Sequence, residues 1–590
     1  MRKVKTNFRM TIAERFFLEK IFELLHRETI DSYRLRLHNP KTIIIELKNV
    51  LDDLKKNKLR NKNYAETLIN ETIRLVDEEN ELEFIGIRKS YFRKIIDQKK
   101  NGGSIDFSQI FYGLCQILLD NKKYLEKLFD SIQLEINRIN NIDIVTPIEL
   151  KDLNRMVGYL FVELKNLGYS KTYLHRFSRA VFSGPRTNNF QDGFNALKTL
   201  IERELEMFSI IVGLKISDDL KSKIHILSDD FKPVKSKYLR KISGNTNDKI
   251  KGYFESNVDL LFIKSEVLSN DYYSATKLVR SRLHYMFDIL HMGHSDKKIN
   301  LHQECVVIGS VDPSKANIQN IEYKFDGYFR SNQNLYKQFI EQLQELKQKE
   351  INPNALSKIY SGLRYLRLGT ETTEVENKLL NYWIGLEYMF SLYDSESYTV
   401  GRLRDYYKKC HATIYIKRLL SDFHLNIKNV GLSSSVDGFD DNLEYLLNQD
   451  TYSHLMNQIA EFPLLAYRAY ILNEHRTNPD KIIGTLEKHQ KNVDWNLNRI
   501  YRIRNEIVHN AAINLSIESI VSHLRYYLVF ILNAAIDFLL NEPVDINNDG
   551  VLDLEDFYIL QDIRLQNLIH DKKISFDLLL KIKNPVEYLT

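Results

Sequence analysis

Long stretches of apolar residues recur with a period of 3.6 along most of this 590-residue chain. The run AERFFLEKIFELLHR at 13–27 is one example, and YAETLINETIRLVDEENELE at 64–83 is another. Only 22 glycines and 10 prolines are present to interrupt such runs. Because this period places apolar side chains on one face of a helix, the chain is predicted to be mainly α-helical. Its length implies roughly three or four domains.

Changes in the residue pattern divide the chain into four predicted parts. The first is a helical N-terminal region at 1–200, in which a helix beginning near 146 has Thr146 as its N-cap and Gly168 at its C-terminal end. Residues 201–340 are predicted to be a small α+β module. The many aromatic side chains of this module are expected to form its core, and not a platform on which nucleic-acid bases stack. Its expected helix is SATKLVRSRLHYMFDILHMG (274–293), and its expected strands are EMFSIIVGLKI (206–216), ECVVIGS (304–310) and IEYKFDGY (321–328).

Residues 350–541 return to a helical pattern, and 542–590 hold an acidic loop followed by helices. The longest apolar segment, YYLVFILNAAIDFLL at 526–540, is too short to span a bilayer and contains Asp537. No apolar signal core is present at the N-terminus, and the three cysteines form no CxxC pair. These features predict a cytoplasmic protein that does not enter a membrane. The net charge of +5 permits RNA binding without requiring it.

One short stretch, RIRNEIVHN at 502–510, carries residues suited to RNA cleavage. It lies on a helix expected to begin near Val493. A loose pattern of arginine followed by histidine is common in the chain, but the tight form Arg-Asn-x-x-x-His occurs once, at Arg504, Asn505 and His509. An imidazole moves protons near neutral pH, a guanidinium stabilises the charge that builds on the phosphorane, and an amide can orient the phosphate or the histidine. The alternative is a solvated helix face with a histidine at its edge.

The RNEIVH motif, on the penultimate helix of a region that opens with KLLNYWIGLEYMF, resembles the HEPN ribonuclease superfamily. The layout is similar to the Apea-like HEPN group of bacterial anti-phage proteins, over about 350–541. The resemblance implies a helical nuclease domain with Arg504, Asn505 and His509 as catalytic residues. It also implies a metal-independent endoribonuclease, in which the 2′-hydroxyl of the RNA attacks and leaves a 2′,3′-cyclic phosphate.

Helical geometry separates the members of this motif. Asn505 and His509 share a face, but Arg504 and His509 lie about 140° apart, and Arg502 falls almost on the stripe of His509. The resemblance implies that two copies of the domain face one composite site, so a homodimer is expected. Arg502 is predicted to bind RNA weakly and to take no part in catalysis.

A second motif, DINNDGVLDLED, follows at 545–556 and matches the calcium loop of EF-hand and dockerin-like modules. Gly550 stands at the turn, and Asp556 replaces the usual glutamate at position 12. The predicted ligands of a structural calcium ion are Asp545, Asn547, Asp549, Val551, Asp553 and Asp556. The alternative is an Asp/Asn-rich turn that caps the following helix. No metal is expected to take part in catalysis.

The resemblance implies an endoribonuclease in anti-phage defence (abortive infection), with a tRNA anticodon loop as the first candidate. Its substrate is expected to be single-stranded or loop RNA, because in-line attack needs a linkage that can leave helical stacking. Residues 1–340 are expected to keep the nuclease inactive until a phage component, such as a phage protein, is sensed. One rival is a non-catalytic HEPN-like scaffold or binding protein, and another is a calcium-regulated interaction protein.

Overall fold

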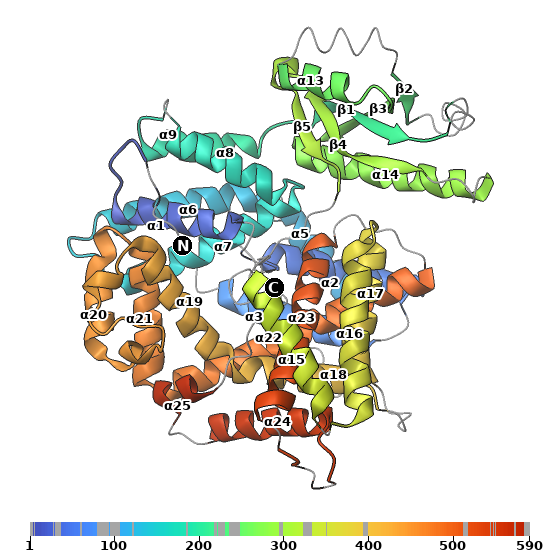
Figure 1. Ribbon diagram of the computed structural model, residues 1–590. Coiled ribbons are helices and arrows are strands. Elements are labelled where there is room, and N and C mark those ends of the chain that lie inside the picture. The colour runs from blue at the N-terminus through green and yellow to red at the C-terminus, as the bar shows by residue number, and fades with distance from the viewer. Residues whose placement is uncertain are drawn as a thin grey trace.

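The computed structural model describes residues 4–582, apart from 5, 27–28, 30–36, 60–61, 80–93, 95–106, 121–122, 185–186, 218–220, 222–229, 235–247, 294–298, 323–332, 350, 393–398, 511–516, 543, 547, 549 and 571–573. The fold is mainly α-helical with one small antiparallel sheet in the middle of the chain, which confirms the predicted fold class (Figure 1).

Helices of the N-terminal region surround one apolar core. They are α1 (Ile12–Leu25), α6 (Tyr124–Asn140), α7 (Lys151–Asn166), α8 (Lys171–Ser183) and α9 (Phe190–Leu200). A capping box between Thr11 and Glu14 starts α1. The N-cap predicted at Thr146 is wrong, because its side chain makes no capping bond and a 3-10 turn, η3 (Pro147–Leu150), precedes α7. Gly168 ends this segment at φ +96°, as expected for a left-handed C-terminal residue.

Three further helices of this region form a core of their own. They are α2 (Pro40–Lys55), α3 (Asn63–Glu79) and α5 (Phe107–Asp120), and their buried side chains include Leu47, Ile69 and Leu114. Asn39 caps α2 and also donates from Nδ2 to Glu163 Oε1 of α7 at 2.9 Å. This unit of α2, α3 and α5, here called the α2–α5 unit, therefore meets the N-terminal bundle through polar contacts.

The sheet lies apart from the helical mass in Figure 1 and has the strand order β2-β3-β1-β4-β5. Its strands are β1 (Glu206–Lys215), β2 (Lys232–Pro233), β3 (Leu261–Ser269), β4 (Asn300–Gly309) and β5 (Asn317–Asn320). Side chains alternate between the faces, so Ile210 packs under α14 (Tyr272–Gly293) and Ile211 under α13 (Asp248–Ser256).

The predicted strands at 206–216 and 304–310 and the helix at 274–293 are confirmed, to within a few residues at their ends. The strand expected at 321–328 falls mostly outside the described residues. Strand β3 was not predicted, because Lys264 and Glu266 interrupt its apolar pattern; its pairing with β1 opposite Ile211 and Ser209 defines it.

Two adjoining apolar cores hold the C-terminal helices. These are α15 (Gln333–Gln348), α16 (Pro353–Glu371), α17 (Val375–Met389), α18 (Thr399–Thr413), α19 (Tyr415–Val430), α20 (Gln449–Asn457), α21 (Pro463–Thr477), α22 (Pro479–Asn510), α23 (Glu518–Asn541), α24 (Leu554–His570) and α25 (Phe576–Lys581), with short 3-10 turns between some of them. Helix α24 contributes to both cores, so the segment after residue 541 packs on the helices that precede it. The predicted division into four domains stays a prediction.

Within the described residues, α23 is the one helix long and apolar enough to be considered for a membrane span. Its most apolar window is 72% buried inside the protein, and Leu524, Leu528 and Ile531 lie in the C-terminal core. It is packed like the core helix of a soluble protein.

Candidate active site on helix α22

Helix α22 carries the Arg-Asn-x-x-x-His motif at its C-terminal end. It runs unbroken for 32 residues from Pro479, so the start predicted near Val493 is wrong. The Asn478 side chain accepts from the N–H of Asp480, and Pro479 suits the first helical turn. Leu497 and Ile500 are fully buried in the C-terminal core. The helix is therefore a rigid support for the motif.

The first two motif residues are joined to each other and to the α2–α5 unit. Arg504 donates from Nη1 to Asn505 Oδ1 at 2.9 Å, and Asn505 donates from Nδ2 to the hydroxyl of Tyr64 at 3.2 Å. Tyr64 is a buried residue of α3, and its ring lies 6.1 Å from that of Tyr501. The amide of Asn505 is thus held from both sides and can keep the guanidinium of Arg504 in place.

His509 lies in the last turn of α22 and is exposed. Its ring has no hydrogen-bond partner among the described residues. Next to it, Val508 is 48% exposed. The imidazole is therefore accessible to a substrate, while Arg504 and Asn505 lie one turn earlier. Within one chain a hydrogen bond joins Arg504 to Asn505, and among the described residues none joins His509 to either.

Arg502, the predicted RNA-binding residue, has both edges of its guanidinium occupied. Nη2 donates to Glu46 Oε1 at 2.6 Å and Nη1 to Glu506 Oε1 at 3.0 Å. The side chain is 14% exposed. In this conformation Arg502 is largely buried and binds two carboxylates.

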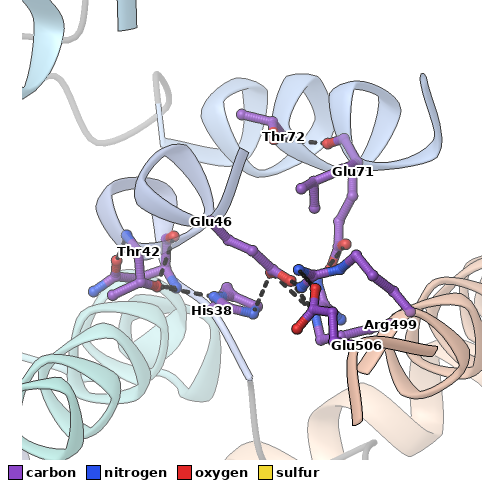
Figure 2. Close-up of polar contacts among 10 residues, drawn as sticks. His38, Thr42, Glu46, Glu71, Thr72, Arg499 and Glu506 are labelled. Carbon is purple, nitrogen blue, oxygen red and sulfur yellow. Dashed lines mark hydrogen bonds and ion pairs between the residues drawn. The ribbon is translucent and has the colours of Figure 1, made fainter. Parts of the chain in front are cut away.

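Sequence reasoning missed Arg499, which lies one turn before Arg502. Its Nε donates to Glu46 at 3.0 Å and its Nη2 to Glu71 Oε2 at 2.7 Å. Figure 2 shows Arg499 between these two glutamates, with His38 on the other side of Glu46. The i, i+3 spacing of Arg499 and Arg502 was a signal for one basic helical face. Nothing in the sequence indicated that α2 and α3 would supply its counter-charges.

The electrostatics of this group follow from burial and pairing. Burial by itself would raise the pKa of Glu46, but Arg499, His38 and Arg502 outweigh it and hold that pKa well below its usual value. Burial would lower the pKa of Arg499, yet Glu46 and Glu71 keep it raised. The pKa of Glu506 is raised, chiefly because burial outweighs its pairing with Arg502. Glu46 is therefore a carboxylate and Arg499 a cation at neutral pH.

The acidic loop of 545–556 forms a closed turn in which its carboxylates accept backbone N–H groups. Asp545 accepts from Asn548 at 2.7 Å and from Gly550 at 2.8 Å. The fully buried Asp556 accepts from Ile546 at 2.8 Å and from Asp553 at 2.9 Å. These bonds are those expected of the alternative, an Asp/Asn-rich turn that caps the following helix.

Other features of the loop suit the calcium motif. Gly550 has φ +82° and Asn548 has φ +61°, so the chain turns at the glycine of the motif. Leu552 pairs with Ile351 in a short parallel bridge, which ties the loop to the start of α16. Val551 is 42% exposed, and the predicted ligands Asn547 and Asp549 lie outside the described residues. The described residues contain no group of three or more metal-binding side chains, and the calcium site stays a prediction.

Comparison with known proteins adds no relative. No protein-family model matches the sequence, and no curated protein or solved structure matches it.

Proposed function

We propose that this protein is a metal-independent endoribonuclease of the HEPN type, acting in the cytoplasm in defence against phage. The observation that carries the proposal is the arrangement on α22. An accessible imidazole, His509, lies one turn beyond an arginine whose guanidinium is held by an asparagine. The substrate is single-stranded or loop RNA, with tRNA anticodon loops as the first candidate, because in-line attack needs a linkage that can leave helical stacking.

The residues suit an internal transfer reaction. The 2′-oxygen of the RNA bonds to the adjacent phosphorus as its proton passes to a base. The bond from phosphorus to the 5′-oxygen breaks, and that oxygen takes up a proton, leaving a 2′,3′-cyclic phosphate and a 5′-hydroxyl. His509 is assigned the proton transfers, Arg504 the charge on the phosphoryl oxygens, and Asn505 the orientation of Arg504.

A second copy of the chain completes the site in this proposal. On one helix, Arg504 and His509 point about 140° apart and cannot both reach one phosphate directly. A homodimer in which the ends of two α22 helices meet would place His509 of one protomer near Arg504 of the other. Sedimentation at micromolar concentration checks this. A strictly monomeric protein that cleaves RNA would exclude the composite site.

The second candidate function is a non-catalytic HEPN-like scaffold that binds a phage component or another partner. The ion pairs on Arg499 and Arg502 favour it, because they give both arginines a structural role. A cleavage product separates the two candidates, since a scaffold releases no 2′,3′-cyclic phosphate.

The test is incubation of the purified protein with total tRNA in EDTA, with and without phage lysate, followed by analysis of the RNA ends. His509→Ala and Arg504→Ala are each expected to lower cleavage by about a hundredfold or more, because both act on the transition state. His570→Ala is the matched control. It removes another histidine from the last turn of an exposed helix end, where Nε2 contacts Gln566 at 2.9 Å. Equal cleavage by all three variants would refute the proposed site.

A further inference from the structure

A buried group of opposite charges joins the α2–α5 unit to the motif helix. Glu46 of α2 and Glu71 of α3 together bind Arg499 and Arg502 of α22, at distances of 2.6–3.0 Å. The Arg499 side chain is 5% exposed. Arg502 lies two residues before Arg504, so this charge cluster adjoins the candidate catalytic motif along α22.

The unit that supplies the glutamates is built as a separate body. Its apolar core contains residues of α2, α3 and α5 and none of α22 among the described residues. Away from the charge cluster, the same interface continues with Lys488 to Glu78 at 2.8 Å and Arg74 to Asn492 at 3.3 Å. It also includes two ring contacts, between Tyr64 and Tyr501 at 6.1 Å and between the guanidinium of Arg74 and Trp495 at 5.3 Å. Interfaces of this polar kind are typical of units that can move relative to each other.

The arginines bind these carboxylates as they would bind phosphates. A guanidinium presents a planar fork of N–H donors that matches carboxylate and phosphate oxygens alike. Glu46 accepts from both Nε of Arg499 and Nη2 of Arg502, which places one anion between two guanidinium groups. An RNA phosphodiester between the same two arginines would satisfy the same donors.

We propose that Arg499 and Arg502 form a binding site for the RNA phosphate backbone, and that Glu46 and Glu71 occupy it as internal phosphate mimics until the α2–α5 unit moves away. This inference rests on the proposed function, since it names how that same site is regulated. It adds Arg499 to the residues that bind RNA. It also assigns to the α2–α5 unit the inhibitory role expected of the N-terminal region.

The N-terminal half also contacts the start of α23, the helix that follows the motif in the chain. Glu518, which opens α23, pairs with Lys277 at 3.0 Å and Arg280 at 3.4 Å, both from α14. Lys165 of α7 donates to Ser519 at 3.0 Å. Elements of the first 300 residues thus hold the helices on both sides of the 511–516 connection that follows His509. A ligand that shifts these elements would change the motif and the phosphate site together.

The experiment measures RNA affinity, not cleavage. Fluorescence anisotropy with a labelled single-stranded 2′-O-methyl RNA, which lacks the attacking hydroxyl, reports binding by the full chain. Glu46→Gln with Glu71→Gln is expected to bind about tenfold more tightly than wild type. Its affinity should depend on salt with a slope steeper by about 1.4, from two added phosphate contacts on a single strand. Adding Arg502→Ala to this variant should remove about half of the extra slope.

Glu23→Gln is the matched control. Glu23 is another buried glutamate that joins the two halves of the chain, through Arg468 of α21, far along the chain from the motif. It should lower stability without changing RNA affinity. If the double variant does not fold, Glu71→Gln alone leaves Glu46 on both arginines and should tighten binding by a few fold.

Unchanged or weaker RNA binding by the folded double variant, or by Glu71→Gln where the double variant does not fold, would overturn the inference. It would identify the cluster as a permanent structural bridge. The readouts also separate the two proposals. Tighter binding without cleavage by any variant would contradict the nuclease and support the mimic. Cleavage by the wild type, with the RNA affinity unchanged in the glutamate variants, would support the nuclease and contradict the phosphate mimic.

Discussion

Among the interfaces that join the N-terminal half of the chain to the C-terminal helices, two are built differently. At the first, α1 packs on α21, and Leu464 and Tyr467 belong to the same apolar core as Phe16. The rings of Phe16 and Tyr467 meet edge to face at 5.7 Å. At the second, the α2–α5 unit meets α22 through ion pairs, and each side keeps its own core.

The contrast bears on which contact can open. A shared apolar core gives up its burial energy when it separates, and no solute replaces it. An arginine–glutamate contact can be exchanged for an arginine–phosphate contact, because the donors remain satisfied. The α1–α21 interface is therefore suited to hold the molecule together. The contact of the α2–α5 unit with α22 is suited to be displaced by an anionic ligand such as RNA.

The two interfaces also differ in the state of a buried glutamate. Glu19 of α1 accepts from the N–H of Leu464 at 3.0 Å, and burial raises its pKa to about 8 despite that bond and the nearby arginines 15 and 468. Glu46 of α2 has its pKa held low by the cations around it. Acid and base should thus act on the two interfaces in opposite directions.

The largest expected effect is the loss of the shared core. Phe16→Ala should lower the free energy of unfolding by about 3–5 kcal/mol, because it removes a fully buried ring. Amide exchange should then increase in both α1 and α21. Leu47→Ala in α2 is the comparison, with a cost of about 2–5 kcal/mol that should appear in α2, α3 and α5 alone. Equal loss of protection in α21 from both variants would mean that the cores are not separate.

The next effect is the response of α1 to pH. The pKa of Glu19 is raised from 4.5 to about 8, so its stabilisation is fully present below pH 4.5 and is lost as the pH rises through about 8. For Glu46 the sign is opposite, and its stabilisation is lost as the pH falls through its lowered pKa. Glu19→Gln should therefore raise the melting temperature at pH 9 relative to wild type, and have less effect at pH 5. The same shift at both pH values would contradict burial of a protonated Glu19.

The smallest effect concerns the loop of 545–556, which pairs with Ile351 before α16. If it binds calcium, wild type should gain about 2.7 kcal/mol of stability at a calcium concentration a hundred times the dissociation constant. Asp545→Ala should abolish this calcium-dependent gain. It should also lower stability slightly in EDTA, because the bonds to Asn548 and Gly550 are lost. Asp577→Ala, at an exposed pair with Lys581, is the control. If millimolar calcium does not change the melting temperature of the wild type, the loop is only a turn and binds no calcium.

Local patterns in the sequence predicted much of the fold. The apolar period of α22, α23 and α16 reflects which side of each helix is buried, because every turn places an apolar residue on that side. The strand β1 and the helix α14 were visible for the same reason. Strand β3 was not, since Lys264 and Glu266 lie on the sheet face away from α14 and leave only a short apolar signal. Thr146 makes no capping bond, and the chain enters α7 through the 3-10 turn η3.

By itself the sequence determined the helical class, the place of Arg504, Asn505 and His509 on one helix, and the acidic turn at 545–556. These depend on spacings of a few residues, which helix and turn geometry translate directly into position. Only the tertiary structure decided that Arg499 and Arg502 are paired with Glu46 and Glu71, more than 400 positions away. Pairing over such a distance is set by how separately formed helices pack, and no local pattern of charges records which face meets which.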